Sequence, residues 1–111
     1  MTAKINVDGG ICGFHTQVKA VSEDSQNVRF EIHSGCEKIK ALSQRLADVG
    51  DIDAYDQIDP SGSGKLLAVF NEMLKGCCSG CAVTVGIFKG MQVAAGLALP
   101  KDIVIKISKS E

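Results

Sequence analysis

The chain has little aromatic character and no segment of concentrated positive charge. Tryptophan is absent, aromatic residues make up 5% of the sequence, and 12 Lys and Arg residues stand against 13 Asp and Glu residues, for a formal net charge of −1. Proteins that bind nucleic acid usually carry a basic surface, often with aromatic side chains that stack on bases. We therefore expect no nucleic-acid partner.

The sequence also lacks a secretion signal. Its first ten residues, MTAKINVDGG, do not contain a charged leader followed by an apolar stretch. We therefore expect a cytoplasmic protein, and in that reducing compartment cysteines more often bind metal or carry out redox chemistry than form structural disulfides. The most apolar segment, 82–99, carries Lys89 and Gln92 near its middle, which favours a buried helix over a membrane span, so we expect no membrane partner.

Several well-known functional motifs are incomplete. The acidic segment 51–62 departs from the calcium-binding EF-hand loop, because Tyr55 replaces a ligand and Gly62 replaces the final glutamate. The segment 62–65, GSGK, departs from a phosphate-binding loop, because Leu66 follows it where Ser or Thr would hold magnesium. No Ser/His/Asp arrangement or carboxylate pair stands out, so the sequence names no catalytic residue and leaves open whether the protein is an enzyme.

What is present suits one small folded domain. The chain has 111 residues, of which 45% are hydrophobic, and this is enough to bury a core without the help of disulfides. No internal repeat and no linker divides the sequence. We therefore expect a single domain that spans residues 1–111.

The N-terminal third has the alternating pattern of β-strands. Residues 4–8 alternate and stop at a Gly-Gly pair, and residues 14–20 and 28–33 each place apolar side chains on one side only. The second and third strands should form an antiparallel hairpin with one apolar and one wet face. His15 and His33 fall on the wet face, where we interpret them as ordinary surface residues, with a ligand or proton-donor role as the alternative.

The remainder of the chain has mainly helical periodicity. Ser34, followed three residues later by Glu37, has the spacing of a capping box and predicts a helix that ends at Gly50. Residues 51–64 are polar and rich in Gly and Ser, which predicts a long surface loop with at most a turn near its start. A second helix is predicted over 65–75.

The last part of the chain predicts one more helix and one more strand. The helix runs from about Cys81 to about Leu99, and small residues recur in it every four positions, which leaves a smooth stripe that another backbone can approach. Residues 102–108, DIVIKIS, predict a final strand. The stripe consists of Gly86, Gly90 and Ala94, and the final strand places Ile103, Ile105 and Ile107 inward.

These elements predict an α+β fold. Their order is strand, strand, strand, helix, helix, helix, strand, which corresponds to a mainly antiparallel sheet of about four strands with three helices packed on one face. Sequential strands with short connections pair antiparallel, and we assume that the helices alternate in direction in the same way. The turns that precede residues 14, 37 and 82 then lie at one edge of the molecule.

All five cysteines lie in these Gly-rich junctions, which read GGICGF, SGCE and KGCCSGCAV. Thiolate is the form that binds metal, and the pKa of a thiol falls at a helix N-terminus, where two of the cysteines are expected. Cys78 and Cys81 also have the spacing of two ligands to one metal, and two further cysteines complete a set of four. The candidate ligands are Cys12, Cys36 and Cys81, with Cys77 and Cys78 competing for the fourth place.

We expect the site to hold an iron-sulfur cluster, used for electron transfer, sensing or cluster delivery to an unknown protein partner. The junctions are rich in Gly and Ser, whose backbone N–H groups can approach cluster sulfur closely. Structural zinc is the alternative, although zinc sites usually show two local cysteine pairs and only one is present. Thiol redox chemistry between Cys78 and Cys81, or burial of the cysteines as small apolar residues, are further alternatives.

A hypothesis of a different class makes the protein a metal-free interaction module. The stripe of small residues, or an open strand edge, would then build a homodimer. Neither hypothesis identifies a substrate.

The motifs GICGF, SGC, CCSGCAVTVG and AAGLALPKD together resemble a small uncharacterised family of cysteine-containing proteins from anaerobic bacteria and archaea. The resemblance covers nearly the whole chain, from Ile5 to Ile107. It implies no activity, but an anaerobic source would suit an iron-sulfur site.

Overall fold

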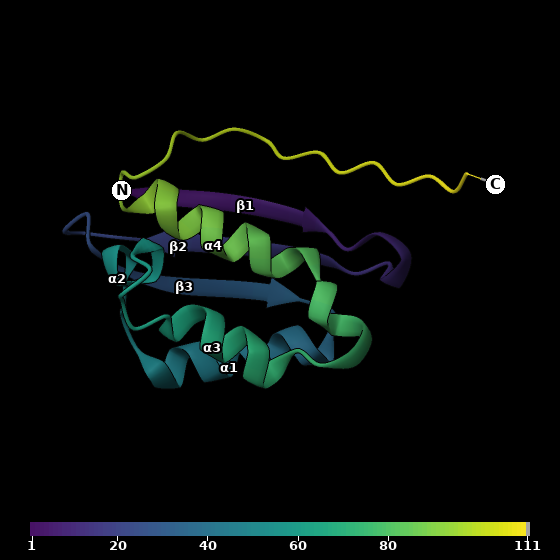
Figure 1. Cartoon of the computed structure of the whole chain (residues 1–111), viewed down its shortest axis with the longest axis horizontal. Coiled ribbons are helices and arrows are strands. Elements are labelled where there is room, and N and C mark those ends of the chain that lie inside the picture. Colours follow the sequence, from purple (N-terminus) through teal and green to yellow (C-terminus); the bar gives the residue numbers. More distant parts are fainter. Residues whose placement is uncertain (111) are drawn as a thin grey trace.

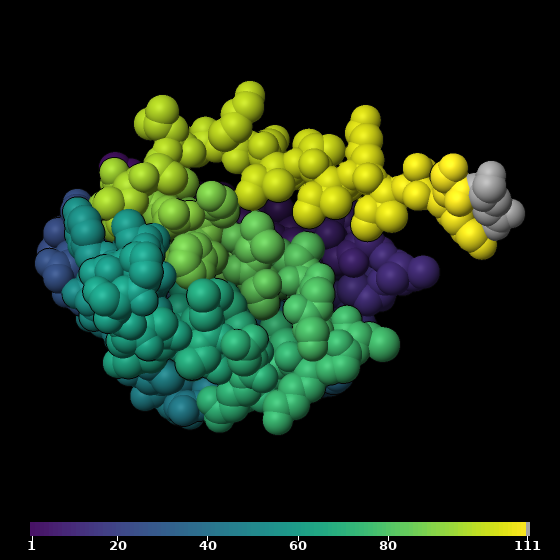
Figure 2. Space-filling model, in the orientation of Figure 1, coloured from purple at the N-terminus to yellow at the C-terminus, as the bar shows by residue number. Residues whose placement is uncertain are grey.

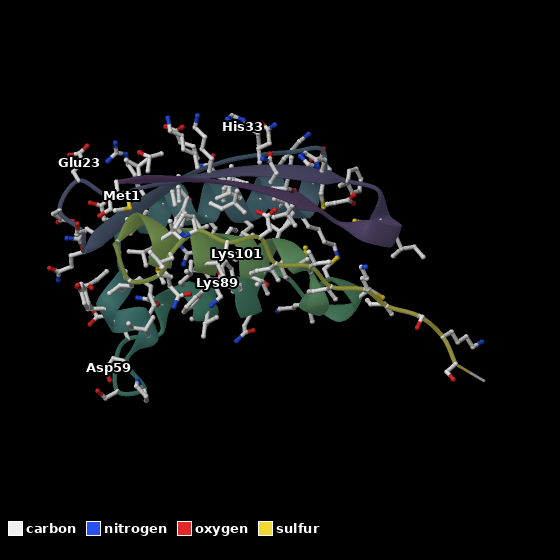
Figure 3. All side chains as sticks on the ribbon, turned by 90° about the horizontal axis from the view of Figure 1, so that it is seen from above. Met1, Glu23, His33, Asp59, Lys89 and Lys101 are labelled. Atoms are coloured by element: carbon white, nitrogen blue, oxygen red, sulfur yellow. The ribbon has the colours of Figure 1, made fainter. Side chains whose placement is uncertain are left out.

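The three alternating segments of the N-terminal third form consecutive antiparallel strands in the computed structural model, which describes residues 1–110. They are β1 (Thr2–Asp8), β2 (His15–Val21) and β3 (Asn27–Ser34). The register aligns Ile5 with Val18 and Val18 with Ile32, so the apolar side chains share one face of the sheet. The opposite face carries the charged and polar side chains and remains uncovered (Figure 3).

A fourth strand, β4 (Ile52–Asp53), completes the sheet in the order β1-β2-β3-β4. It pairs antiparallel with the first two residues of β3 and directly precedes the short helix α2 (Ala54–Ile58). The prediction of a loop over 51–64 was therefore wrong in its first half. Ile52 is fully buried beside Val28, and Asp53 caps α2 by accepting hydrogen bonds from the backbone N–H groups of the next turn.

Three main helices cover the apolar face of the sheet: α1 (Glu37–Val49), α3 (Lys65–Met73) and α4 (Ala82–Ala94). Helix α4 packs on β1 and β2, α1 packs on β3, and α3 packs against α1 (Figure 1). The α+β class, the four antiparallel strands and the three helices are thus confirmed. The predicted order is corrected, since the fourth strand lies between helices and not at the C-terminal end.

Helix α4 ends five residues earlier than predicted. Gly96 adopts a φ of 77°, which is a left-handed conformation that favours glycine. The N–H of Gly96 donates to the carbonyl of Val93, and the N–H of Leu97 donates to that of Gln92. This pair of hydrogen bonds is the Schellman arrangement that closes many helices, and it accounts for the early end.

The stripe of small residues in α4 faces the chain's own sheet. A Cβ atom added to Gly86 would lie 2.7 Å from Val7 Cγ2, and one added to Gly90 would overlap Ile5. The stripe therefore lets α4 approach β1 and is not an open surface for a partner. By length and composition alone, Gly76–Ala94, with a mean hydropathy of 1.3, passes the test for a membrane-spanning helix, as core helices also do.

The predicted final strand is not formed. Residues 101–110 are all exposed, and residues 101–108 have neither helical nor strand structure. The segment runs in an extended conformation along the side of the molecule that carries β1 and α4 (Figure 1). A strand requires a neighbour for its backbone hydrogen bonds, and within one chain this segment has none.

Candidate cysteine site

The β1–β2 turn and the junction between β3 and α1 lie at the same end of the sheet. Asp8, the last residue of β1, pairs with His15, and Thr16 pairs with Ser34, the last residue of β3. Cys12 lies in the turn that follows Asp8, and Cys36 lies two residues beyond Ser34. Antiparallel pairing therefore brings these two cysteines to one end of the molecule.

Helix α4 begins at that same end. Gly90 lies against Ile5, and Gly86, one turn earlier in the helix, lies against Val7. Moving toward the N-terminus of α4 is thus moving toward the Asp8 end of β1. Cys78 and Cys81, which precede α4, therefore reach the end of the sheet that carries Cys12 and Cys36 (Figure 1).

Cys12 is the last residue of a 3₁₀-helix, η1 (Gly10–Cys12), which lies inside the tight turn between β1 and β2. The N–H of Gly9 donates to the carbonyl of Phe14 at 2.9 Å, and Cys12 Sγ lies 3.6 Å from the carbonyl oxygen of Gly9. A Cβ atom at Gly9 would lie only 2.5 Å from that sulfur. The glycine thus makes room for the thiol, which remains exposed to solvent.

Cys36 is the N-cap residue of α1, and its side chain is half-buried against the core. The predicted capping box is not formed. The Ser34 hydroxyl instead accepts the N–H of Cys36 at 3.1 Å and the hydroxyl of the buried Thr16 at 2.8 Å. The chain between Ser34 and Cys36 is tight because a Cβ at Gly35 would lie 3.2 Å from the ring of Phe14.

Cys78 and Cys81 lie on either side of the end of a second 3₁₀-helix, η2 (Gly76–Gly80). The N–H of Cys81 donates to the carbonyl of Cys78 at 3.1 Å, and the carbonyl of Cys81 accepts the Thr84 hydroxyl at 2.9 Å. Both side chains are half-buried and pack against the core. Cys77, by contrast, is exposed.

Burial and neighbouring thiols both act on the pKa of Cys81. Burial raises it, the backbone N–H of Val83 lowers it, and Cys12, Cys36 and Cys78 raise it further by repulsion between negative charges. The sequence had predicted a lowered thiol pKa at this helix start. The structure has the opposite direction for Cys81, because burial and three neighbouring sulfurs outweigh the helix terminus.

The topology therefore carries the cysteine-containing junctions to one end of the sheet, and Cys12, Cys36 and Cys78 each act on the pKa of Cys81. Cys77 lies in the same junction as Cys78 but is exposed, and all five cysteines are free thiols. Within residues 1–110, no three or more His, Cys, Asp and Glu side chains are arranged so as to hold a single metal ion.

The two histidines remain surface residues. His15 and His33 are exposed on the polar face of the sheet, and His33 points away from the helix layer (Figure 3). His33 pairs with Gln17, so the two histidines are diagonal neighbours and not direct partners. The half-buried cysteines pack toward the helix side of the sheet.

Sequence reasoning missed the role of one residue that shapes the site. Thr16 is almost fully buried and orients Ser34, while Phe14 packs on Gly35 between the two cysteine turns. Thr16 carried a detectable signal, because it is the one polar residue on the apolar side of β2. Buried hydroxyls need a hydrogen-bond partner, so a partner on β3 was to be expected.

The fold and this site define a two-layer α+β domain with a cysteine-lined end. The chain belongs to a family of unknown function, DUF6951, whose match spans residues 3–107. No curated protein and no solved structure is detectably similar to the chain.

Proposed function

We propose that the domain holds an iron-sulfur cluster through the thiolates of Cys12, Cys36, Cys78 and Cys81. The observation that carries the proposal is the convergence of four thiols, from three separate junctions, at one end of the sheet. Four thiolates are the usual ligand set of [2Fe–2S] and [4Fe–4S] clusters.

The spacing of the cysteines along the chain favours a cluster over zinc. Structural zinc sites usually show two local cysteine pairs, whereas this chain has one, Cys78 and Cys81. Within residues 1–110, no three His, Cys, Asp or Glu side chains are arranged to hold a single ion.

The electrostatics of the metal-free site also favour the binding of a metal cation or cluster. Burial and repulsion from Cys12, Cys36 and Cys78 disfavour the thiolate form of Cys81, and the positive charge of a bound metal would offset both effects and hold the coordinated thiols as thiolates. The surrounding turns offer backbone N–H groups at glycines, and the ring of Phe14 lies against Gly35, next to Cys36. Both features are known to tune clusters.

Electron transfer, sensing and cluster delivery are the roles that such a site serves in a domain without evident catalytic residues. Cys12 is exposed, which leaves one side of the site open to a protein that exchanges electrons or accepts a cluster. The proposal includes a cytoplasmic setting in an anaerobic organism, where exposed clusters survive.

The test is metal analysis of protein purified without oxygen. We expect iron and acid-labile sulfide in equal amounts, with the charge-transfer absorption of a cluster. Serine variants of Cys36 and Cys81 should lose iron equally, whereas Cys77→Ser, the matched control, should retain it. Colourless protein that still fails to take up iron and sulfide during anaerobic reconstitution would exclude the cluster. Stoichiometric zinc in the purified protein would instead support a structural zinc site.

A further inference from the structure

Two parts of the fold lack a strand partner within one chain, and each is suited to pair with the other. The first is the outer edge of β1, which has β2 on one side and no strand on the other. The second is the C-terminal segment 102–108, which has the alternating composition of a strand but no partner. Neither feature belongs to the cysteine site.

The C-terminal segment, DIVIKIS, is strongly apolar, and each of its residues is exposed. Ile103 is 53% exposed, Ile105 66% and Ile107 90%, although these three share one side of an extended chain. The backbone groups of residues 101–108 make no hydrogen bond to another segment. Isoleucines at alternate positions are favourable in a paired strand and unfavourable in water.

The outer edge of β1 offers the backbone hydrogen-bond partners that the C-terminal segment lacks. β1 has seven residues, the same length as 102–108, and its outward backbone groups are unpaired by any strand. Ala3, Ile5 and Val7 point toward α4, but Ile5 and Val7 are only half-buried. A further strand with isoleucines on that face would cover them and continue the apolar layer under α4.

The polar sides match as well. A strand that places Ile103, Ile105 and Ile107 toward the helix layer places Asp102, Lys106 and Ser108 on the wet face, together with one apolar residue, Val104. That face of β1 carries Lys4 and Asp8. The register that buries the isoleucines is thus the one that keeps the charges in water.

We propose that 102–108 of one copy pairs with β1 of a second copy, in a reciprocal exchange that makes a symmetric homodimer. The occupant is a second copy because the segment runs beside the β1 side of its own chain without forming a backbone hydrogen bond to it (Figures 1 and 2). Ile107 stays 90% exposed in this position, so its own chain leaves it uncovered. Each copy offers one donor strand and one acceptor edge, which is the requirement for a closed two-fold assembly.

The first experiment measures mass in solution by light scattering, with reductant present to prevent disulfide-linked dimers. The full chain should be a dimer, and a chain that ends at Pro100 should be a folded monomer, because residues 101–110 bury nothing in the core. Ile105→Asp should weaken the dimer at least tenfold. Val104→Asp, on the opposite side of the same strand, is the matched control and should leave the dimer intact.

The second experiment identifies which chains pair. Equal amounts of ¹⁴N and ¹⁵N protein are mixed, exchanged and treated with a short amine cross-linker. Lys4 of β1 and Lys106 of the segment should be joined in products of mixed isotope label. Same-label products only, in a monomeric protein, would show pairing within one chain and overturn the proposal; so would a dimer that survives truncation after Pro100.

Discussion

Gly90 of α4 lies so close to Ile5 of β1 that a methyl group on the glycine would overlap the end of the isoleucine side chain. Ala20 of β2 closes the other side, 3.6 Å from the position of that methyl group. The absence of side chains at this point lets the helix approach the sheet closely. It therefore also sets the position of Cys81 at the start of the same helix.

The Gly90→Ala variant should be destabilised. The added methyl group forces Ile5 or the whole helix to move, and such overpacking typically costs about 1–3 kcal/mol. Chemical denaturation gives the free energy of unfolding directly. Combination with Ile5→Val, which removes the overlapping methyl group, should recover part of the loss.

Gly80→Ala is the matched control, because a Cβ at Gly80 meets nothing within 4 Å. It should change stability by less than about 1 kcal/mol, because an added methyl group that meets no other atom has little effect on packing. Equal losses in the Gly80 and Gly90 variants would show that contact with Ile5 is not the cause.

Gln57 connects three segments through its buried amide, and its replacement by leucine should destabilise the fold. Its oxygen accepts the N–H of Leu66 at 2.9 Å, and its nitrogen donates to the carbonyl of Asp53 at 3.1 Å. Leucine leaves both backbone groups without these partners, at an expected cost of about 1–3 kcal/mol. Thermal denaturation of Gln57→Leu tests this.

Gln44→Leu on the exposed face of α1 controls for the loss of an amide. Gln44 bonds only to Asp48, one turn away on the same helix surface, at 3.3 Å. Its replacement should shift stability by no more than about 0.5 kcal/mol. If the Gln57 variant were as stable as this control, the hydrogen bonds of Gln57 would not stabilise the fold.

The elements with a clear period could be predicted from the sequence. The strand pattern located β1, β2 and β3 to within two residues at each end, because alternation records which side chains are buried. The helix pattern located α1, α3 and α4 for the same reason. The shared location of the cysteine-containing junctions could be predicted from these elements, because antiparallel neighbours bring every second turn to the same end of the sheet.

The remainder depended on contacts between distant parts of the chain. β4 has two residues and so no period, and it exists because Ile52 pairs with Val28. The segment 102–108 has the period of a strand, but a pattern of side chains specifies a face and not a partner. The pKa direction of Cys81 depended first on its burial and then on the thiols of Cys78 and of two other turns, which no local rule at a helix start includes.

Asp24 should titrate well below an ordinary aspartate. It accepts hydrogen bonds from the side chain of Asn27 and from the backbone N–H groups of Asn27 and Gln26. These hydrogen bonds, with the Asn27 side chain contributing most, lower the pKa of Asp24 from 3.8 to about 2. Because the folded-state pKa is lowered, the stabilisation is complete above the unfolded value and is lost as the pH falls toward 2.

An NMR titration of the Asp24 carboxyl carbon measures this pKa. The midpoint should lie at about 2, and Asn27→Ala should move it upward toward 3.8. An unchanged midpoint in the Asn27 variant would show that the side-chain hydrogen bond is not the main cause.

Cys81 should be alkylated slowly in the reduced, metal-free protein. Burial and repulsion from Cys12, Cys36 and Cys78 raise its pKa, so less of it is thiolate near neutral pH than in an unfolded chain. The effect on stability follows from this direction: the contribution of Cys81 to stability is complete below its unfolded-state pKa and is lost as the pH rises through its folded-state pKa.

Site-resolved alkylation, followed by mass spectrometry from neutral to alkaline pH, should show Cys77 modified first and Cys81 late. Cys12→Ser removes one repelling charge and should shift the Cys81 profile to lower pH, whereas a profile that matches the protein in denaturant would mean that the four thiols do not share one site.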